Sequence, residues 1–163
     1  MKRQAPYLIV ILVLGVLDQI AKAWVVSAVP LYGVKRIIPG FFDLTHIRNS
    51  GAIFGLMSRS GSRLVTYGLV GLQLFALAMV VFYFLKTPPS EKPAKWAMAI
   101  ILGGALGNFV DRLVRGYVID FLELYAGRFH WPTFNLADSC ITVGAVALIA
   151  TILLRRPHAP DSR

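Results

Sequence analysis

The stretch NFVDRLVRGYVIDFLELYAGRFHWPTFNLADS, residues 108–139, decides how this chain is organised. It lies between two apolar runs that are long enough to cross a membrane. It also holds four of the eight acidic residues of the chain, which are Asp111, Asp120, Glu123 and Asp138. Ionisable side chains at the edge of a bilayer are costly in free energy, so they mark functional sites. We expect an active site at a membrane surface, with Asp120 and Asp138 performing the chemistry.

Two amides in this stretch stand three residues before a carboxylate. Asn108 precedes Asp111 in this way, and Asn135 precedes Asp138. Residues three apart are neighbours on the surface of a helix, so each amide shares a face with its carboxylate. The spacing predicts that these polar groups line the same site.

The composition indicates a membrane protein. Apolar residues make up 56% of the 163 residues and charged residues only 15%, whereas soluble chains carry about 25% charged residues. A helix of about 20 apolar residues crosses a bilayer, and four stretches have this length. We predict an all-α membrane protein, one integral-membrane domain over residues 1–163, with transmembrane helices at about 7–29, 64–85, 96–113 and 134–154.

The first of these stretches also fits a secretory signal peptide, because it follows a basic start and contains the small-x-small sequence Ala21-Lys22-Ala23. Its length and the polar residues Asp18, Gln19 and Lys22 favour a transmembrane helix. Asp18 and Lys22 are four residues apart, so they can form an ion pair that lowers the cost of burial. Asp18 can equally support a polar site from the neighbouring helix, and the spacing leaves both roles open.

Residues 30–63 form a long connection after the first span. Residues 34–38 and 41–47 are rich in strand-forming residues, and the turn dipeptide Pro39-Gly40 separates them. These patterns predict a small β-sheet between the first two spans, which rests on the membrane surface and cradles a substrate segment.

The sequence Arg48-Asn49-Ser50-Gly51 follows the second predicted strand. Its small residues allow another backbone to approach closely, and the amide of Asn49 offers both a donor and an acceptor. A plain turn after a strand explains the same residues, so local sequence does not separate the two interpretations.

The distribution of basic residues predicts the orientation. The segments 1–6, 86–95 and 155–163 hold 8 Lys and Arg in 25 residues, against 7 in the 54 residues of 30–63 and 114–133. Cytoplasmic loops carry the excess of positive charge. We therefore expect both termini in the cytoplasm and the two long connections, with the active site, at the outer face.

Other classes of function fit less well. The net charge of +9 comes without a basic helix or a nucleic-acid-binding motif, so no nucleic-acid partner is expected. Cys140 is the single cysteine, and His46, His130 and His158 lack metal-ligand spacing, so neither a metal nor a cofactor is expected. A serine–lysine pair is disfavoured, because Asp18 would keep Lys22 charged and a poor base.

Two carboxylates remain as catalytic groups. Asp120 has apolar neighbours that should raise its pKa, while Asp138 lies in the first turn of the fourth span, where free N–H groups favour its ionised form. Such opposed environments suit a general acid and a general base, as in aspartic proteases. The alternatives are a helix cap for Asp138 and an ion pair of Asp120 with Arg112 or Arg115. The alternative function is a small four-span transporter that uses intramembrane carboxylates.

These residues resemble the lipoprotein signal peptidase family (signal peptidase II), the aspartyl proteases of the bacterial inner membrane. The resemblance runs through five ordered blocks, which are LDQIAK at 17–22, RNSGAIF at 48–54, GGALGNFVDR at 103–112, VIDF at 118–121 and FNLADS at 134–139. Arg48 and Ile53 depart from the residues common in the family, which concerns the shape of the substrate channel near Asn49.

The resemblance implies that Asp120 and Asp138 are the catalytic dyad and that Asp18 and Lys22 are structural polar residues. Residues implied to support the site or bind substrate are Asn49, Gly51, Asn108, Asp111, Arg112, Asn135 and Ala137. The implied reaction removes the signal peptide of a prolipoprotein just before a cysteine that carries a diacylglyceryl group. The resemblance also implies a protein that needs no cofactor, contacts membrane lipid and is blocked by globomycin, and we expect a monomer.

Overall fold

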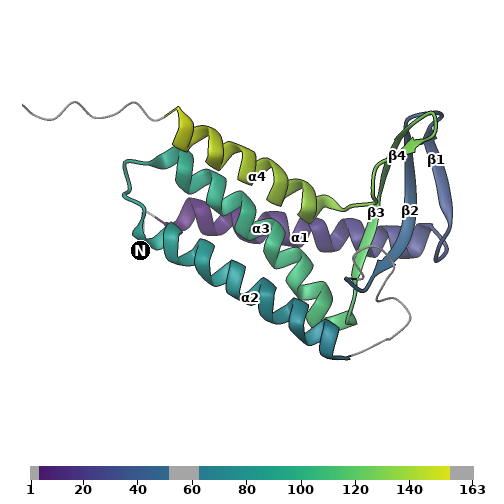
Figure 1. Ribbon diagram of the computed structural model, residues 1–163, viewed down its shortest axis with the longest axis horizontal. Coiled ribbons are helices and arrows are strands. Elements are labelled where there is room, and N and C mark those ends of the chain that lie inside the picture. The colour runs from purple at the N-terminus through teal and green to yellow at the C-terminus, as the bar shows by residue number, and fades with distance from the viewer. Residues whose placement is uncertain (1–3, 52–62, 155–163) are drawn as a thin grey trace, which may run out of the picture.

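A bundle of four helices with a small sheet at one end makes up the computed structural model, which describes residues 4–51 and 63–154 (Figure 1). The helices are α1 (Ala5–Ala28), α2 (Arg63–Lys86), α3 (Lys92–Arg115) and α4 (Leu136–Leu153). Each helix overlaps one of the predicted transmembrane segments. Within the described residues, α1, α3 and α4 are long and apolar enough to cross a membrane, and the apolar part of α2 is the shorter Val70–Lys86.

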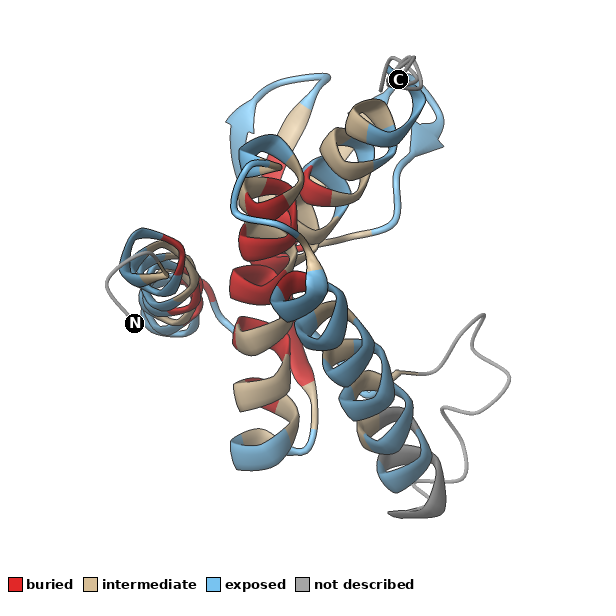
Figure 2. Ribbon diagram, turned by 90° about the vertical axis from the view of Figure 1, so that its left-hand side faces the viewer, coloured by how far each residue is buried: buried red, intermediate tan, exposed pale blue. Residues whose placement is uncertain are grey.

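Helix α3 is the centre of the bundle, because α1, α2 and α4 all pack against it. Buried residues are concentrated in this helix, whereas α2 is largely exposed (Figure 2). The exposed faces of the other helices carry large apolar side chains such as Leu12, Ile20, Phe75 and Val146. An apolar outer surface around a polar interior is the arrangement that a bilayer requires.

Three glycines of α3 allow the neighbouring helices to approach closely. A Cβ on Gly103 would lie 2.8 Å from the Cβ of Leu14 in α1. A Cβ on Gly104 would collide with the carbonyl oxygen of Ala137 at the start of α4, and one on Gly107 would collide with the carboxylate of Asp18. Small residues at helix interfaces are typical of membrane bundles, and here they bring α1 and α4 against the polar part of α3.

Replacing Gly104 with alanine should therefore separate α3 from α4 at the start of α4. We expect a loss of about 1–3 kcal/mol in the free energy of unfolding, as for other overpacked sites. Thermal unfolding in detergent measures it. Gly71→Ala on α2 is the matched control, because a Cβ there has no heavy atom within 4 Å. Equal unfolding temperatures for the two variants would contradict the close approach of α3 and α4.

The sheet contains four antiparallel strands in the order β1 (Val34–Ile38), β2 (Phe42–Asn49), β3 (Val118–Ala126) and β4 (Phe129–His130). The first two strands confirm the predicted pair, and Gly40 in the turn between them has a φ of 83°, which glycine adopts without strain.

The predicted sheet was incomplete, because it was assigned to the connection between the first two spans alone. Half of the strands come from the connection between α3 and α4. The first four residues of β3 are all buried, since the strand runs between β2 and the ends of the helices. A strand that is buried on both faces lacks the alternation of apolar and polar residues from which an amphipathic strand is predicted.

Pairing of β2 with β3 brings two predicted site residues to the same end of the sheet. Asp120 stands opposite Ile47, and Val118 stands opposite Asn49. Directly after the sheet, the backbone of Phe134 is hydrogen-bonded to that of Leu122, and this bond leads the chain into α4. The carboxylate of β3 thus lies beside the start of α4.

Candidate active site

Asp120 is held by two amides from different parts of the chain. Its side chain projects from β3 into a buried position, with 2% of the residue exposed. The Nδ2 of Asn49 donates to its Oδ2 at 2.8 Å, and the Nδ2 of Asn135 donates to its Oδ1 at 2.8 Å. Each carboxylate oxygen therefore has a fixed donor.

Asp138 is the third residue of α4 and takes part in its N-terminal cap. The Oδ1 of Asn135 accepts from the backbone N–H of Asp138 at 2.9 Å, and the Oδ2 of Asp138 accepts from the backbone N–H of Asn135 at 3.2 Å. This reciprocal pair is a capping box. The other oxygen of Asp138 accepts from the Nδ2 of Asn108 at 2.7 Å. The cap interpretation was therefore right, and it leaves one oxygen of Asp138 directed at the polar interior.

Asn135 connects the two carboxylates. Its Oδ1 caps α4 beside Asp138, while its Nδ2 donates to Asp120 and also to the Oδ1 of Asn108 at 3.1 Å. Asn135 is fully buried, so water does not compete for these hydrogen bonds. A single amide thereby sets the position of the strand carboxylate relative to the helix carboxylate.

Lys22 orients the amide of Asn108. The buried Nζ of Lys22 lies 2.7 Å from Asp18, 2.8 Å from Asp111 and 3.0 Å from the Oδ1 of Asn108. An ammonium group has three donors, and here each has an acceptor. Because the Oδ1 of Asn108 faces this cation, its NH₂ group is turned toward Asp138.

Asp18 has both of the roles that its sequence spacing left open. It pairs with Lys22, and its Oδ1 accepts from the backbone N–H of Ala137 at 2.9 Å. Asp111 likewise pairs with Lys22 and accepts from the backbone N–H of Ile119 at 3.2 Å. The two buried carboxylates thus attach α4 and β3 to the helices that carry them.

The alternative role of Asp120, an ion pair with Arg112 or Arg115, is not what the described residues show. Arg115 pairs with Asp111, and Arg112 donates to the Oε1 of Gln73 on α2 at 2.8 Å. Among the ion pairs of the described residues, none includes Asp120. The donors to Asp120 are neutral amides instead.

Gly51 fixes the orientation of Asn49. Its backbone N–H donates to the Oδ1 of Asn49 at 2.8 Å, which leaves the NH₂ group of Asn49 for Asp120. Gly51 has a φ of 82°, a conformation that favours glycine. Arg48 lies against the ring of Tyr117, with its guanidinium carbon 4.8 Å from the ring centroid. Ile53 lies outside the described residues.

The surroundings of the two carboxylates differ. The pKa of Asp120 is raised to about 6, chiefly by burial and also by the charge of Asp138, while the hydrogen bonds from the amides of Asn49 and Asn135 oppose the rise. Asp138 is only half-buried and accepts from a backbone N–H in the first turn of a helix, where the macrodipole favours negative charge. The two carboxylates therefore differ in burial and in the donors that bind them.

No role was predicted from the sequence for Gln19 and Gln73, which add further hydrogen bonds between the helices around the site. The Nε2 of Gln19 donates to Asp111 at 3.2 Å, and its Oε1 accepts from Arg115 at 2.9 Å. Gln73 accepts from Arg112 and donates to the carbonyl oxygen of Ala105 at 3.1 Å. Both glutamines stand within apolar helices, where polar residues join helices by hydrogen bonds. Their position in the sequence could therefore have predicted this role.

Ser27 and Ser139, the serines that a serine–lysine pair would use, both donate to backbone carbonyl oxygens. Ser139 donates to the carbonyl oxygen of Asn135 at 3.0 Å, and Ser27 donates to that of Trp24 at 2.8 Å. In residues 4–51 and 63–154, no group of three or more His, Cys, Asp or Glu side chains is placed to hold a metal ion.

An apolar bundle that holds two carboxylates linked through buried amides has the features of a membrane peptidase. The family model described as signal peptidase (SPase) II matches residues 10–154. The chain belongs to the signal peptidase II family.

Two named relatives and one solved structure support this family membership. The chain is 40% identical over 142 residues to a lipoprotein signal peptidase of Syntrophus aciditrophicus, which covers 86% of this chain and 87% of the relative. It is 43% identical over 151 residues to one of Burkholderia pseudomallei, covering 93% and 89%. A bacterial membrane enzyme solved by the in meso method at 1.9 Å superposes with a TM-score of 0.80 at 27% identity, covering 93% of this chain and 95% of that one.

Proposed function

We propose that this peptidase removes the signal peptide of diacylglyceryl-modified prolipoproteins by cleaving just before the lipidated cysteine. Asp120 and Asp138 are the catalytic pair. The main support is that Asn135 connects these two carboxylates, from β3 and α4, at the end of an apolar bundle. Membership of the signal peptidase II family and the names of the relatives support the substrate class.

The unequal surroundings of the two acids support different roles for them. Ionised Asp138 takes a proton from water, and the resulting hydroxyl attacks the scissile carbonyl carbon. Protonated Asp120 donates its proton to the carbonyl oxygen, so a neutral tetrahedral diol forms. Asp138 then passes its proton to the leaving nitrogen while Asp120 takes back a proton from the diol, which breaks the C–N bond and restores both acids.

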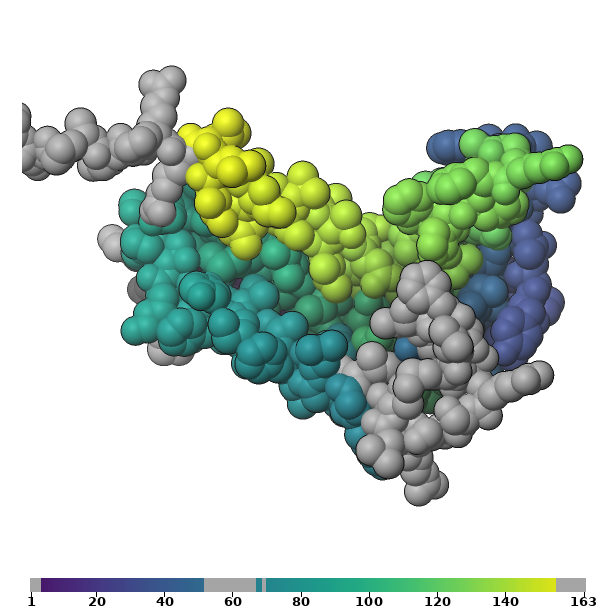
Figure 3. Space-filling model, viewed as in Figure 1, coloured from purple at the N-terminus to yellow at the C-terminus, as the bar shows by residue number. Residues whose placement is uncertain are grey.

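The position of the site in the bundle supports a place near one surface of the membrane. Strand β3 and the start of α4, which carry Asp120 and Asp138, lie next to each other at the end of the bundle that bears the sheet (Figures 1 and 3). At 1.5 Å per residue, the 24 residues of α2 extend about 36 Å, enough to cross a hydrocarbon core of about 30 Å. All four helices of this single domain span the bacterial inner membrane, with both termini cytoplasmic and the sheet cradling substrate at the outer face.

This placement suits the substrate. A diacylglyceryl cysteine stays anchored in lipid, so the scissile amide has to be cut near the membrane surface. The protein acts as a monomer among membrane lipids, with carboxylates and amides as its catalytic groups and without a cofactor. Globomycin inhibits it by occupying this site.

The direct test uses the purified full-length chain and two forms of one prolipoprotein, with and without the diacylglyceryl group. Mass spectrometry of the products should show a single cut before the cysteine in the lipidated form only. Cleavage elsewhere, or equal cleavage of both forms, would overturn the proposed specificity. Transport of an ion without any cleavage would favour the four-span transporter.

The pH dependence tests the role of Asp120. The pKa of this group lies near 6 in the free protein, and kcat/KM reports ionisations of the free enzyme. We expect kcat/KM to fall as pH rises through this value, because Asp120 loses the proton that it donates. The amide of Asn49 stabilises the charged form, so Asn49→Ala should raise the pKa and move this decline to higher pH. A shift to lower pH would contradict the assignment.

A further inference from the structure

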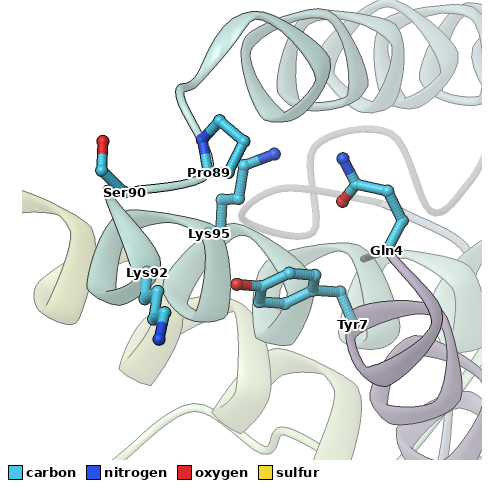
Figure 4. A pocket seen from close by; sticks show the side chains of 6 residues that line it. All are labelled: Gln4, Tyr7, Pro89, Ser90, Lys92 and Lys95. Atoms are coloured by element: carbon cyan, nitrogen blue, oxygen red, sulfur yellow. The ribbon is translucent and has the colours of Figure 1, made fainter. Parts of the chain in front are cut away.

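A cavity lies beside the start of α1 and the start of α3, at the end of the bundle opposite the sheet (Figures 1 and 4). Its volume is about 430 Å³, and its lining includes Gln4, Tyr7, Pro89, Ser90, Lys92 and Lys95. Lys92 and Asp111 are 19 residues apart on α3, which is about 29 Å along the helix. The cavity is therefore remote from the carboxylates, and the peptidase reaction gives it no role.

Lys95 is a buried cation on the wall of this cavity. Only 2% of it is exposed. Its Nζ donates to the carbonyl oxygen of Phe84 at 2.9 Å and lies 4.5 Å from the centroid of the Phe84 ring. No carboxylate of the described residues forms an ion pair with it. A buried ammonium group needs a compensating negative charge, and two of its three N–H donors remain for an anion.

Gln4 adds an acceptor to the same cavity. It precedes α1, and its buried Oε1 accepts no hydrogen bond. Buried polar atoms in native proteins almost always have a partner, so this oxygen is complementary to a group that donates. Lysine ammonium groups beside an unpaired acceptor match a ligand that carries an anion and a hydrogen-bond donor close together.

An apolar groove lies deeper along the same helices. It has a volume of about 270 Å³ and is lined only by apolar residues from three helices, including Leu8 and Ile11 of α1, Leu77 and Val81 of α2, and Leu102 of α3. Phe84 links the two spaces, because it lines the groove and its carbonyl oxygen accepts a hydrogen bond from Lys95, which lines the cavity. A polar cavity continued by an apolar groove has the form of a headgroup and an acyl chain.

We propose that this end of the bundle binds one glycerophospholipid of the leaflet opposite the sheet. Lys92 and Lys95 supply the positive charge that attracts the phosphate, a hydroxyl or amine of the headgroup donates to Gln4, and an acyl chain follows the groove. The position of the cavity along the membrane normal fits a lipid headgroup. The 24 residues of α1 extend about 36 Å, which is longer than a hydrocarbon core of about 30 Å, so Gln4 at the end of this helix can reach the headgroup region. Exposed lysines at this end also suit the positive-inside rule, but that rule does not require a fully buried Lys95.

Native mass spectrometry of the delipidated full-length protein tests whether a glycerophospholipid binds at this end of the bundle. The probes are phosphatidylglycerol, phosphatidylethanolamine and phosphatidylcholine with identical acyl chains, and glycerol phosphate. Phosphatidylglycerol and phosphatidylethanolamine carry headgroup donors, whereas the choline group has none, so we expect about tenfold stronger retention of the first two. Lys92→Gln should weaken binding of all three lipids by about tenfold.

Lys86→Gln is the matched control, because Lys86 ends α2 outside the cavity lining. Gln4→Met, which removes the unpaired acceptor, should abolish the preference over phosphatidylcholine while leaving the effect of Lys92→Gln intact. The proposal is overturned if the three lipids bind equally to the unmodified protein, or if Lys92→Gln behaves like Lys86→Gln. Glycerol phosphate that binds as tightly as the lipids would show a soluble anion as the ligand and overturn the lipid assignment.

Discussion

Asp120→Asn and Asp138→Asn should each give a folded protein that no longer cleaves prolipoprotein. An asparagine cannot donate the proton that Asp120 supplies, nor accept the one that Asp138 takes from water. General acid and base catalysis contribute about 100-fold to 10,000-fold each, so the rate constant for cleavage should fall by at least about 100-fold. The folds should persist, because Asn49 is exposed and can turn to solvent when its acceptor changes.

Glu123→Gln is the control for this experiment. Glu123 is another carboxylate of β3, and it pairs with His130 on the surface of the hairpin. Its replacement should leave cleavage near the rate of the unmodified protein, while thermal unfolding confirms that all three variants fold. Cleavage by a folded Asp138→Asn variant at the unmodified rate would reduce Asp138 to its helix-capping role and remove it from the catalytic pair.

Lys22→Met should give the largest loss of stability in the chain. The substitution keeps the length of the side chain but leaves Asp18 and Asp111 buried together without their shared cation. Breaking a buried ion pair by removing one partner costs about 3–5 kcal/mol. Thermal unfolding of the purified protein measures the effect, with Lys35→Met on the exposed strand β1 as the control.

Adding Asp111→Asn to Lys22→Met separates electrostatics from packing. If the loss comes from an uncompensated carboxylate, the double variant should unfold at a higher temperature than Lys22→Met alone, because residues of one ion-pair network are not additive. A lower unfolding temperature for the double variant would show that the two substitutions act independently, which would contradict the account of Lys22 as a shared counter-ion.

Helices and carboxylates could be predicted from sequence because both are local properties. Length and hydropathy outlined the four helices, and a carboxylate in an apolar stretch marked Asp120. Strand β3 was missed because Val118, Ile119, Asp120 and Phe121 are all buried, which erases the alternation on which strand prediction depends.

Hydrogen-bond and ion-pair partners that lie far apart in the sequence could not be predicted. Asn135 was expected to face Asp138 as its helical neighbour, whereas its amide also reaches Asp120 and Asn108. Sequence spacing gives contacts within one helix, but a side chain shared by three elements depends on how those elements pack. The same limit explains why Lys22 was paired with Asp18 alone, although it also binds Asp111 and Asn108.

The double use of Asn135 has a consequence for biosynthesis. One amide both starts α4 and positions Asp120, so the catalytic pair exists only when α4 has become helical against α3 and β3. Helix α4 is the last of the four to leave the ribosome. If Asp120 and Asp138 are the catalytic pair, as proposed, a nascent chain that has not yet inserted α4 lacks the assembled pair and does not yet cut neighbouring signal peptides.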